Sequence, residues 1–65
     1  MPCGTWKTTD IPEAQVPRVE FGYNAEGPIS VTREQQADGK WTVTAVFEDC
    51  PPGQPNETEQ THSDT

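Results

Sequence analysis

The residues able to do chemistry are few and widely spaced in this sequence of 65 residues. The single histidine, His62, lies in a polar C-terminal stretch, whereas a general base or metal ligand needs a fixed site with partners. A nucleophilic cysteine also needs a nearby base, and Glu48 and Asp49 beside Cys50 oppose formation of a thiolate. We therefore expect no catalytic residue, no metal site and no cofactor.

The charge of the chain restricts its partners. Eleven acidic and four basic residues give a formal net charge of -7. Such a chain repels the phosphates of nucleic acids and of anionic membranes. No stretch of the sequence is long and apolar enough to span a bilayer. A chain this short also builds no deep cleft for a small-molecule substrate. We expect a non-enzymatic protein that binds another protein or assembles with copies of itself. A partner with a basic surface would suit its negative charge.

Cys3 and Cys50 are the only cysteines, and they show neither a CxxC pair nor a zinc-ligand spacing. A disulfide between them would add on the order of 4 kcal/mol in the chain-entropy model. That is comparable to the ~3–5 kcal/mol expected of so small a core. Two reduced thiols in a cytosolic protein are the open alternative. No secretory signal follows Met1, so a cytoplasmic or virion-associated location is slightly favoured over secretion.

The strongest element signal is a hairpin over Ile29 to Phe47. Ile29–Gln35 and Lys40–Asp49 both alternate apolar and polar residues, as half-buried strands do. A two-residue turn at Asp38-Gly39 would set the apolar face of one strand against the polar face of the other. A three-residue loop, 37–39, with Gly39 left-handed instead pairs Gln35 with Trp41, Arg33 with Val43, Val31 with Ala45 and Ile29 with Phe47. We favour this loop over a short helix spanning Arg33–Asp38.

The predicted fold is all-β: a three-stranded antiparallel meander over residues 18–23, 29–36 and 40–49. Residues 18–23 (RVEFGY) alternate, with Val19, Phe21 and Tyr23 on one face. Thr5 to Thr9 reads as a fourth, N-terminal edge strand with Lys7 protecting the edge.

The sequence predicts one small domain over residues 1–50, followed by a tail over residues 51–65. Residues 1–17 form an extended Pro-rich arm, because the prolines at 12 and 17 favour extended geometry before them. Residues 18–49 form the meander. Residues 51–65 are predicted to be a disordered acidic tail, because Asn56 to Thr65 contains no aliphatic or aromatic residue.

The aromatic residues are the best candidates for binding a partner protein. We assign Phe21 and Phe47 to the core, while Trp6 and Trp41 are compatible with either core or interface. The interface candidates are Trp6, Trp41, Tyr23 and Val16. The Thr-rich reverse face of the sheet is either its wet side or a ligand surface.

A three-stranded sheet with one apolar face needs a cover. The arm supplies part of that cover, and another protein could supply the rest. We therefore expect a structural or interaction protein that docks on a larger assembly, for example a bacteriophage virion accessory or decoration protein. The alternative is a small secreted or host-directed inhibitor or binding protein stapled by a Cys3–Cys50 disulfide.

Overall fold

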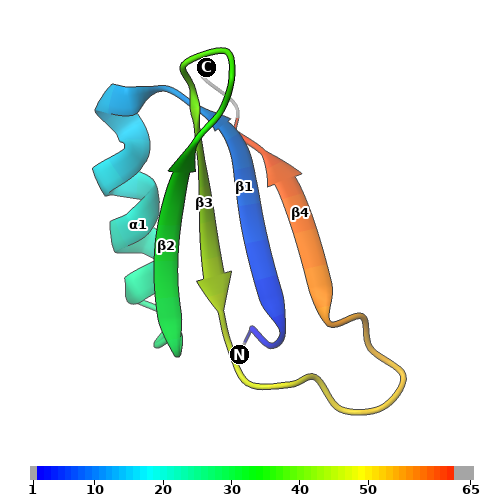
Figure 1. Ribbon diagram of the computed structural model, residues 1–65. Helices are drawn as coiled ribbons and strands as arrows, with labels where there is room; N and C mark the ends of the chain where they lie inside the picture. The colour runs from blue at the N-terminus through cyan, green and yellow to red at the C-terminus, as the bar shows by residue number, and fades with distance from the viewer. Residues whose placement is uncertain (1, 63–65) are drawn as a thin grey trace.

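The computed structural model describes residues 2–62, which form a small β-rich fold of one four-stranded mixed sheet and one short helix (Figure 1). The elements in chain order are β1 (Thr5–Ile11), a 3-10 turn η1 (Glu13–Gln15), α1 (Val16–Asn24), β2 (Ser30–Gln35), β3 (Trp41–Val46) and β4 (Glu57–Thr61). The strand order is β2-β3-β1-β4. β3 is antiparallel to both β1 and β2, whereas β4 is parallel to β1.

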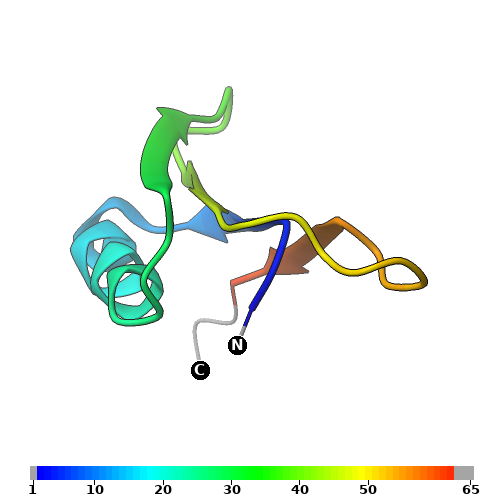
Figure 2. The ribbon, with the colours of Figure 1, turned by 90° about the horizontal axis from the view of Figure 1, so that it is seen from below.

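The core lies between the sheet and α1, which packs on one face only (Figure 2). Ile11, Val16 and Val43 are its most buried side chains. The partly buried Val19, Tyr23, Val31 and Trp41 pack around them. No helix among residues 2–62 is long and apolar enough to cross a membrane.

The predicted hairpin register is confirmed. Val31 pairs with Ala45, Arg33 with Val43 and Gln35 with Trp41. Gly39 has a φ of 90°, and the backbone N–H of Gln36 donates to the carbonyl oxygen of Lys40 (2.7 Å). The loop therefore holds three residues, as the matching of apolar faces requires. The ladder ends at Ser30, and Ile29 stays 68% exposed instead of joining the apolar face.

The predicted strand at 18–23 is wrong, because these residues belong to α1. Val16, Val19 and Tyr23 are three and four residues apart, so a helix places all three on the core side. Pro17 sits in the first helical turn, where a missing N–H costs nothing. Phe21 then points away from the core and is 77% exposed, which corrects its assignment as a core residue.

The N-terminal strand exists, but it lies at the centre of the sheet and not at the edge. Strand β1 replaces much of the predicted extended arm and carries Ile11 into the core. Its pairing with β3 is irregular between Thr8 and Ile11, where Asp10 has a φ of 59°. The Gln36 side chain fills this bulge, accepting from the Asp10 N–H (2.7 Å) and from the Thr42 hydroxyl (2.9 Å).

The predicted disorder of the tail is wrong for residues 57–61. Residues 57–61 form β4, which is held by backbone pairing to β1 and needs no apolar side chain for that purpose. The Asn56 side chain accepts from the Cys50 N–H (2.7 Å), and the Thr5 N–H donates to the Asn56 carbonyl (2.7 Å). These contacts fix the start of β4 beside β1. Residues 63–65 of the predicted tail lie outside the described residues.

Candidate functional site

The two cysteines are joined in a disulfide, with their Cα atoms 5.0 Å apart. The bond links the entry to β1 with the end of the segment that follows β3. Beyond it, residues 51–55 form an exposed proline-rich loop that projects from the sheet (Figure 1). The loop contains a turn in which the Gln54 N–H donates to the Pro51 carbonyl (3.2 Å), with Gly53 at a φ of 95°. This staple takes both sulfur atoms out of nucleophilic chemistry.

His62 serves to anchor the end of β4. Its Nε2 atom lies 2.6 Å from Oε1 of Gln15, and its backbone N–H donates to the Thr9 carbonyl (2.8 Å). Within residues 2–62 no group of three or more His, Cys, Asp or Glu side chains is placed to hold a metal ion.

An aromatic hollow opens on the helix side of the sheet, beside the last turn of α1. Trp6 faces this side because it pairs with Ala45, whose side chain is buried there. Tyr23 approaches from α1, and Phe47 follows directly after β3. The residues lining this aromatic hollow are Pro2, Trp6, Tyr23, Glu26 and Phe47, around about 460 Å³ of open space.

The polar atoms of the two larger aromatic side chains are already satisfied within the chain. The Trp6 Nε1–H donates to the Cys3 carbonyl oxygen (3.0 Å). The Tyr23 hydroxyl is 2.6 Å from the Thr8 hydroxyl. These residues offer a ligand mainly aromatic carbon surface, and the one charged group in the lining is the Glu26 carboxylate.

The surroundings of the aromatic hollow are acidic. A neighbouring hollow shares Pro2, Glu26 and Phe47 with it and adds Glu48 and Asp49. On the other side Tyr23 joins it to a groove that follows α1 and β4, lined by Thr8, Val19, Gly22, Tyr23, Gln60, Thr61 and His62. The aromatic hollow is thus the apolar middle of a longer surface between α1 and β4.

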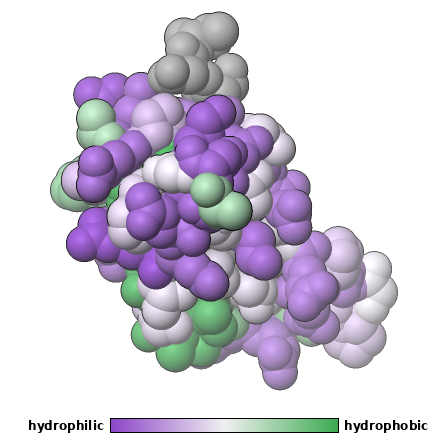
Figure 3. Space-filling view, turned by 45° about the horizontal axis from the view of Figure 1, so that its top comes forward, coloured by the Kyte–Doolittle hydropathy of each residue, from purple (hydrophilic) through white to green (hydrophobic). Residues whose placement is uncertain are grey.

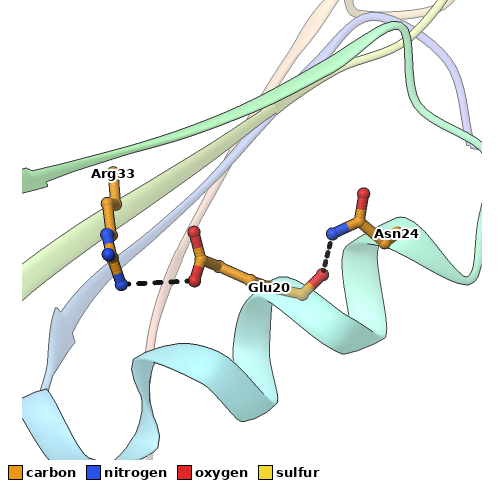
Figure 4. Close-up of polar contacts among 3 residues, drawn as sticks. All are labelled: Glu20, Asn24 and Arg33. Atoms are coloured by element: carbon orange, nitrogen blue, oxygen red, sulfur yellow. Dashed lines mark hydrogen bonds and ion pairs between the residues drawn. The ribbon is translucent and has the colours of Figure 1, made fainter.

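The other interface candidates lie elsewhere. Val16 is only 2% exposed and belongs to the core, so it offers no surface. Trp41 is covered by the Arg33 guanidinium, whose carbon lies 5.8 Å from the ring centroid. Arg33 is held in turn by Glu20 of α1 (3.5 Å), as Figure 4 shows together with the bond from Asn24 to the Glu20 carbonyl. The structure therefore brings Trp6 and Tyr23 together in the aromatic hollow, whereas Trp41 and Val16 do not line it.

The opposite face of the sheet carries no helix and is the predicted Thr-rich face. Thr5, Lys7, Thr42 and Thr44 lie on it, with Glu57 and Glu59 of β4 beside them. The space-filling view from this side is mostly hydrophilic, with hydrophobic residues gathered near the start of β2 (Figure 3). This arrangement matches the wet side of a sheet more closely than a formed pocket.

Sequence reasoning missed Glu26 and Pro2 as parts of the aromatic hollow. Glu26 sits in a turn whose composition indicates only a loop, and Pro2 precedes the first strand; neither position carries a signal of the contact. Comparisons with protein-family models, with curated proteins and with solved structures found no match.

Proposed function

We propose that this chain is a non-enzymatic interaction domain that docks on a larger protein assembly, with the surface between α1 and β4 as its contact. The observation that carries the proposal is the meeting of Trp6 and Tyr23 in one hollow with their polar atoms already bonded inside the chain. Tryptophan and tyrosine in such positions supply most of the binding energy at protein interfaces. The lining offers aromatic surface and one carboxylate, and these groups suit the binding of another protein.

The proposed partner presents a basic segment to this surface. The chain has a net charge of -7, and Glu26, Glu48 and Asp49 lie around the aromatic hollow. Opposite charges steer two proteins together and fix their orientation. A second copy of this acidic chain would meet repulsion at the same surface, so a different protein is the better partner.

The sheet of this chain is less in need of a partner's cover than the sequence indicates. Helix α1 supplies much of the cover that a three-stranded sheet would lack. The surface left for a partner is the aromatic hollow beside the helix. A decoration or accessory protein of a virion remains the proposed setting, because disulfides such as Cys3–Cys50 persist on virion surfaces and outside cells.

A second candidate is a secreted or host-directed inhibitor or binding protein. The observation that favours it is the exposed loop 51–55, which the disulfide and the Asn56 side chain hold at its base. A loop fixed in one shape loses less conformational entropy on binding. Here the contact residues would be the loop prolines and Gln54 instead of Trp6.

Affinity capture with matched variants separates these two functions. Wild type, Trp6→Ala and Gln54→Ala would be immobilised and exposed to proteins of the natural source at moderate salt. A third bait, Thr44→Ala, alters the opposite face and serves as the control. Docking through the aromatic hollow predicts one recurrent partner that wild type, Gln54→Ala and Thr44→Ala retain and Trp6→Ala loses.

The same partner should elute as salt rises, because the contact pairs opposite charges. Loss of the partner with Gln54→Ala alone would favour the inhibitor candidate. Equal retention by all four baits would contradict both proposals. A circular dichroism spectrum of each folded bait excludes unfolding as the cause of a loss.

A further inference from the structure

We infer that the aromatic hollow is a binding site for a single side-chain cation, the ammonium group of a lysine or the guanidinium group of an arginine on the partner segment. The inference rests on the proposed function, because it names the group that the docking surface would recognise. It concerns Pro2, Trp6, Tyr23, Glu26 and Phe47 alone.

The aromatic rings are the first support. A ring presents a negative face, which attracts a cation within about 6 Å of its centroid, and tryptophan does so most strongly. The Trp6 Nε1–H is bonded to the Cys3 carbonyl oxygen, so the indole presents no spare donor, and the Tyr23 hydroxyl already shares one hydrogen bond with the Thr8 hydroxyl. Aromatic carbon and a carboxylate together are the chemistry that an organic cation prefers.

The second support is the missing counter-charge. The chain has four basic residues, and none lines the aromatic hollow. Lys7 lies on the opposite face of the sheet, Arg18 is on the exposed side of α1, Arg33 bonds Glu20, and Lys40 is in the exposed hairpin loop. Among residues 2–62, no Lys or Arg side chain lines the aromatic hollow or the adjoining hollow that holds Glu26, Glu48 and Asp49. A basic side chain of a partner would meet no competing Lys or Arg from this part of the chain.

Trp41 provides a comparison within the same fold. Its ring has an internal cation, the Arg33 guanidinium at 5.8 Å, and Arg33 also meets a carboxylate, that of Glu20. The aromatic hollow repeats this combination of tryptophan and glutamate, but without the basic residue. A partner's lysine or arginine would complete at Trp6 the arrangement that the chain completes by itself at Trp41.

The test is an NMR titration of the full chain with three small probes. Nα-acetyl-lysine methylamide and Nα-acetyl-arginine methylamide carry the cation, and Nα-acetyl-norleucine methylamide has a similar aliphatic chain without charge. The Trp6 indole N–H and the Tyr23 ring report the aromatic hollow, while the Trp41 indole N–H is the internal control. We expect saturable shifts at Trp6 with the cationic probes, and binding of the norleucine probe weaker by about two- to five-fold or more.

Paired variants test the role of charge. Glu26→Gln should weaken binding of the lysine probe by about two- to five-fold. Glu34→Gln makes the same change of net charge on the opposite face of the sheet and should leave binding unchanged. Equal binding of the norleucine and lysine probes, or equal effects of the two variants, would overturn the inference. So would shifts confined to Trp41.

The titration and the affinity capture fail independently. If Trp6→Ala loses the partner but no cationic probe shifts the Trp6 signal, the docking proposal stands and the cation site is wrong. If the probes bind at Trp6 but no partner depends on Trp6, the cation site stands and the docking proposal is wrong.

Discussion

At the scale of single residues, Gly4 allows two segments of backbone to lie very close together. Gly4 is buried with a φ of 75°, and a Cβ atom there would lie 2.3 Å from the Asn56 carbonyl oxygen. Only glycine allows the entry to β1 and the start of β4 to approach so closely. A side chain at this position must push β4 away from β1.

We predict that Gly4→Ala destabilises the protein by about 1–3 kcal/mol, because the substitution combines a backbone clash with a strained φ. Gly27→Ala is the matched control: its φ is 76°, but nothing lies within 4 Å of the added Cβ. Urea unfolding of both variants separates the two effects. Equal losses would mean that the close approach to Asn56 contributes nothing beyond backbone strain.

A second prediction concerns the Gln36 side chain, which bonds Asp10 at the bulge in β1 and Thr42 in the neighbouring strand β3. Gln36→Ala leaves the Asp10 N–H without its partner and should cost about 1–2 kcal/mol of unfolding free energy. Gln35→Ala, at an exposed neighbour with a single long contact of 3.5 Å, should cost less than 0.5 kcal/mol, as surface substitutions usually do. Denaturant titration of the two variants measures the difference. Similar losses of unfolding free energy would show that the Gln36 hydrogen bonds do not stabilise the bulge.

At the scale of elements, a strand held mainly by backbone hydrogen bonds should open more easily than a strand held also by buried side chains. β4 contains no aliphatic or aromatic residue, and four of its five residues are exposed. β3, in contrast, carries the buried Val43 and Ala45. Regions with few buried apolar contacts open at low free-energy cost.

We therefore predict that the amide hydrogens of β4 exchange with solvent at least about ten-fold faster than those of β3 in the folded protein. Hydrogen exchange followed by NMR, residue by residue, provides the measurement. Comparable protection in both strands would show that the contacts of Asn56 and His62 secure β4 as firmly as a core strand.

The same distinction explains how far the sequence could predict the elements. The hairpin register was predictable because a slip of one residue would place Val31 and Val43 on opposite faces of the sheet. Helix α1 was missed because Val19, Phe21 and Tyr23 alternate like a strand, and only Val16, outside that window, reveals the helical spacing. β4 was missed because its partner is the backbone of β1, which side-chain patterns do not report. For the candidate site, the sequence predicted Trp6 and Tyr23 as interface candidates, but their meeting with Glu26 depends on α1.

At the scale of the whole molecule, the disulfide supports a core of very few buried side chains. The Cys3–Cys50 bond encloses β1, α1, β2 and β3 in one covalent ring with a sequence separation of 47. In the chain-entropy model such a ring is worth on the order of 4 kcal/mol. A domain of this size has little stability to spare.

We predict that Cys3→Ser/Cys50→Ser loses about 2–5 kcal/mol and is largely unfolded at 37 °C. Wild type should behave in the same way after reduction. Thermal unfolding followed by circular dichroism, with and without reductant, is the measurement. A double serine variant with the melting temperature of the oxidised wild type would show that packing alone sustains the fold.

The position of β1 determines when the protein can fold during synthesis. β1 precedes the helix and the hairpin, yet it pairs on one side with β3 and on the other with β4, the last strand among residues 2–62. Both of its edges therefore stay open while the ribosome makes the helix and the hairpin, and one edge stays open until Thr61 has emerged. Pairing across such a span of sequence is slow, and an exposed central strand is prone to wrong pairing. The acidic residues of the chain would then act early, keeping nascent copies apart before the sheet is complete.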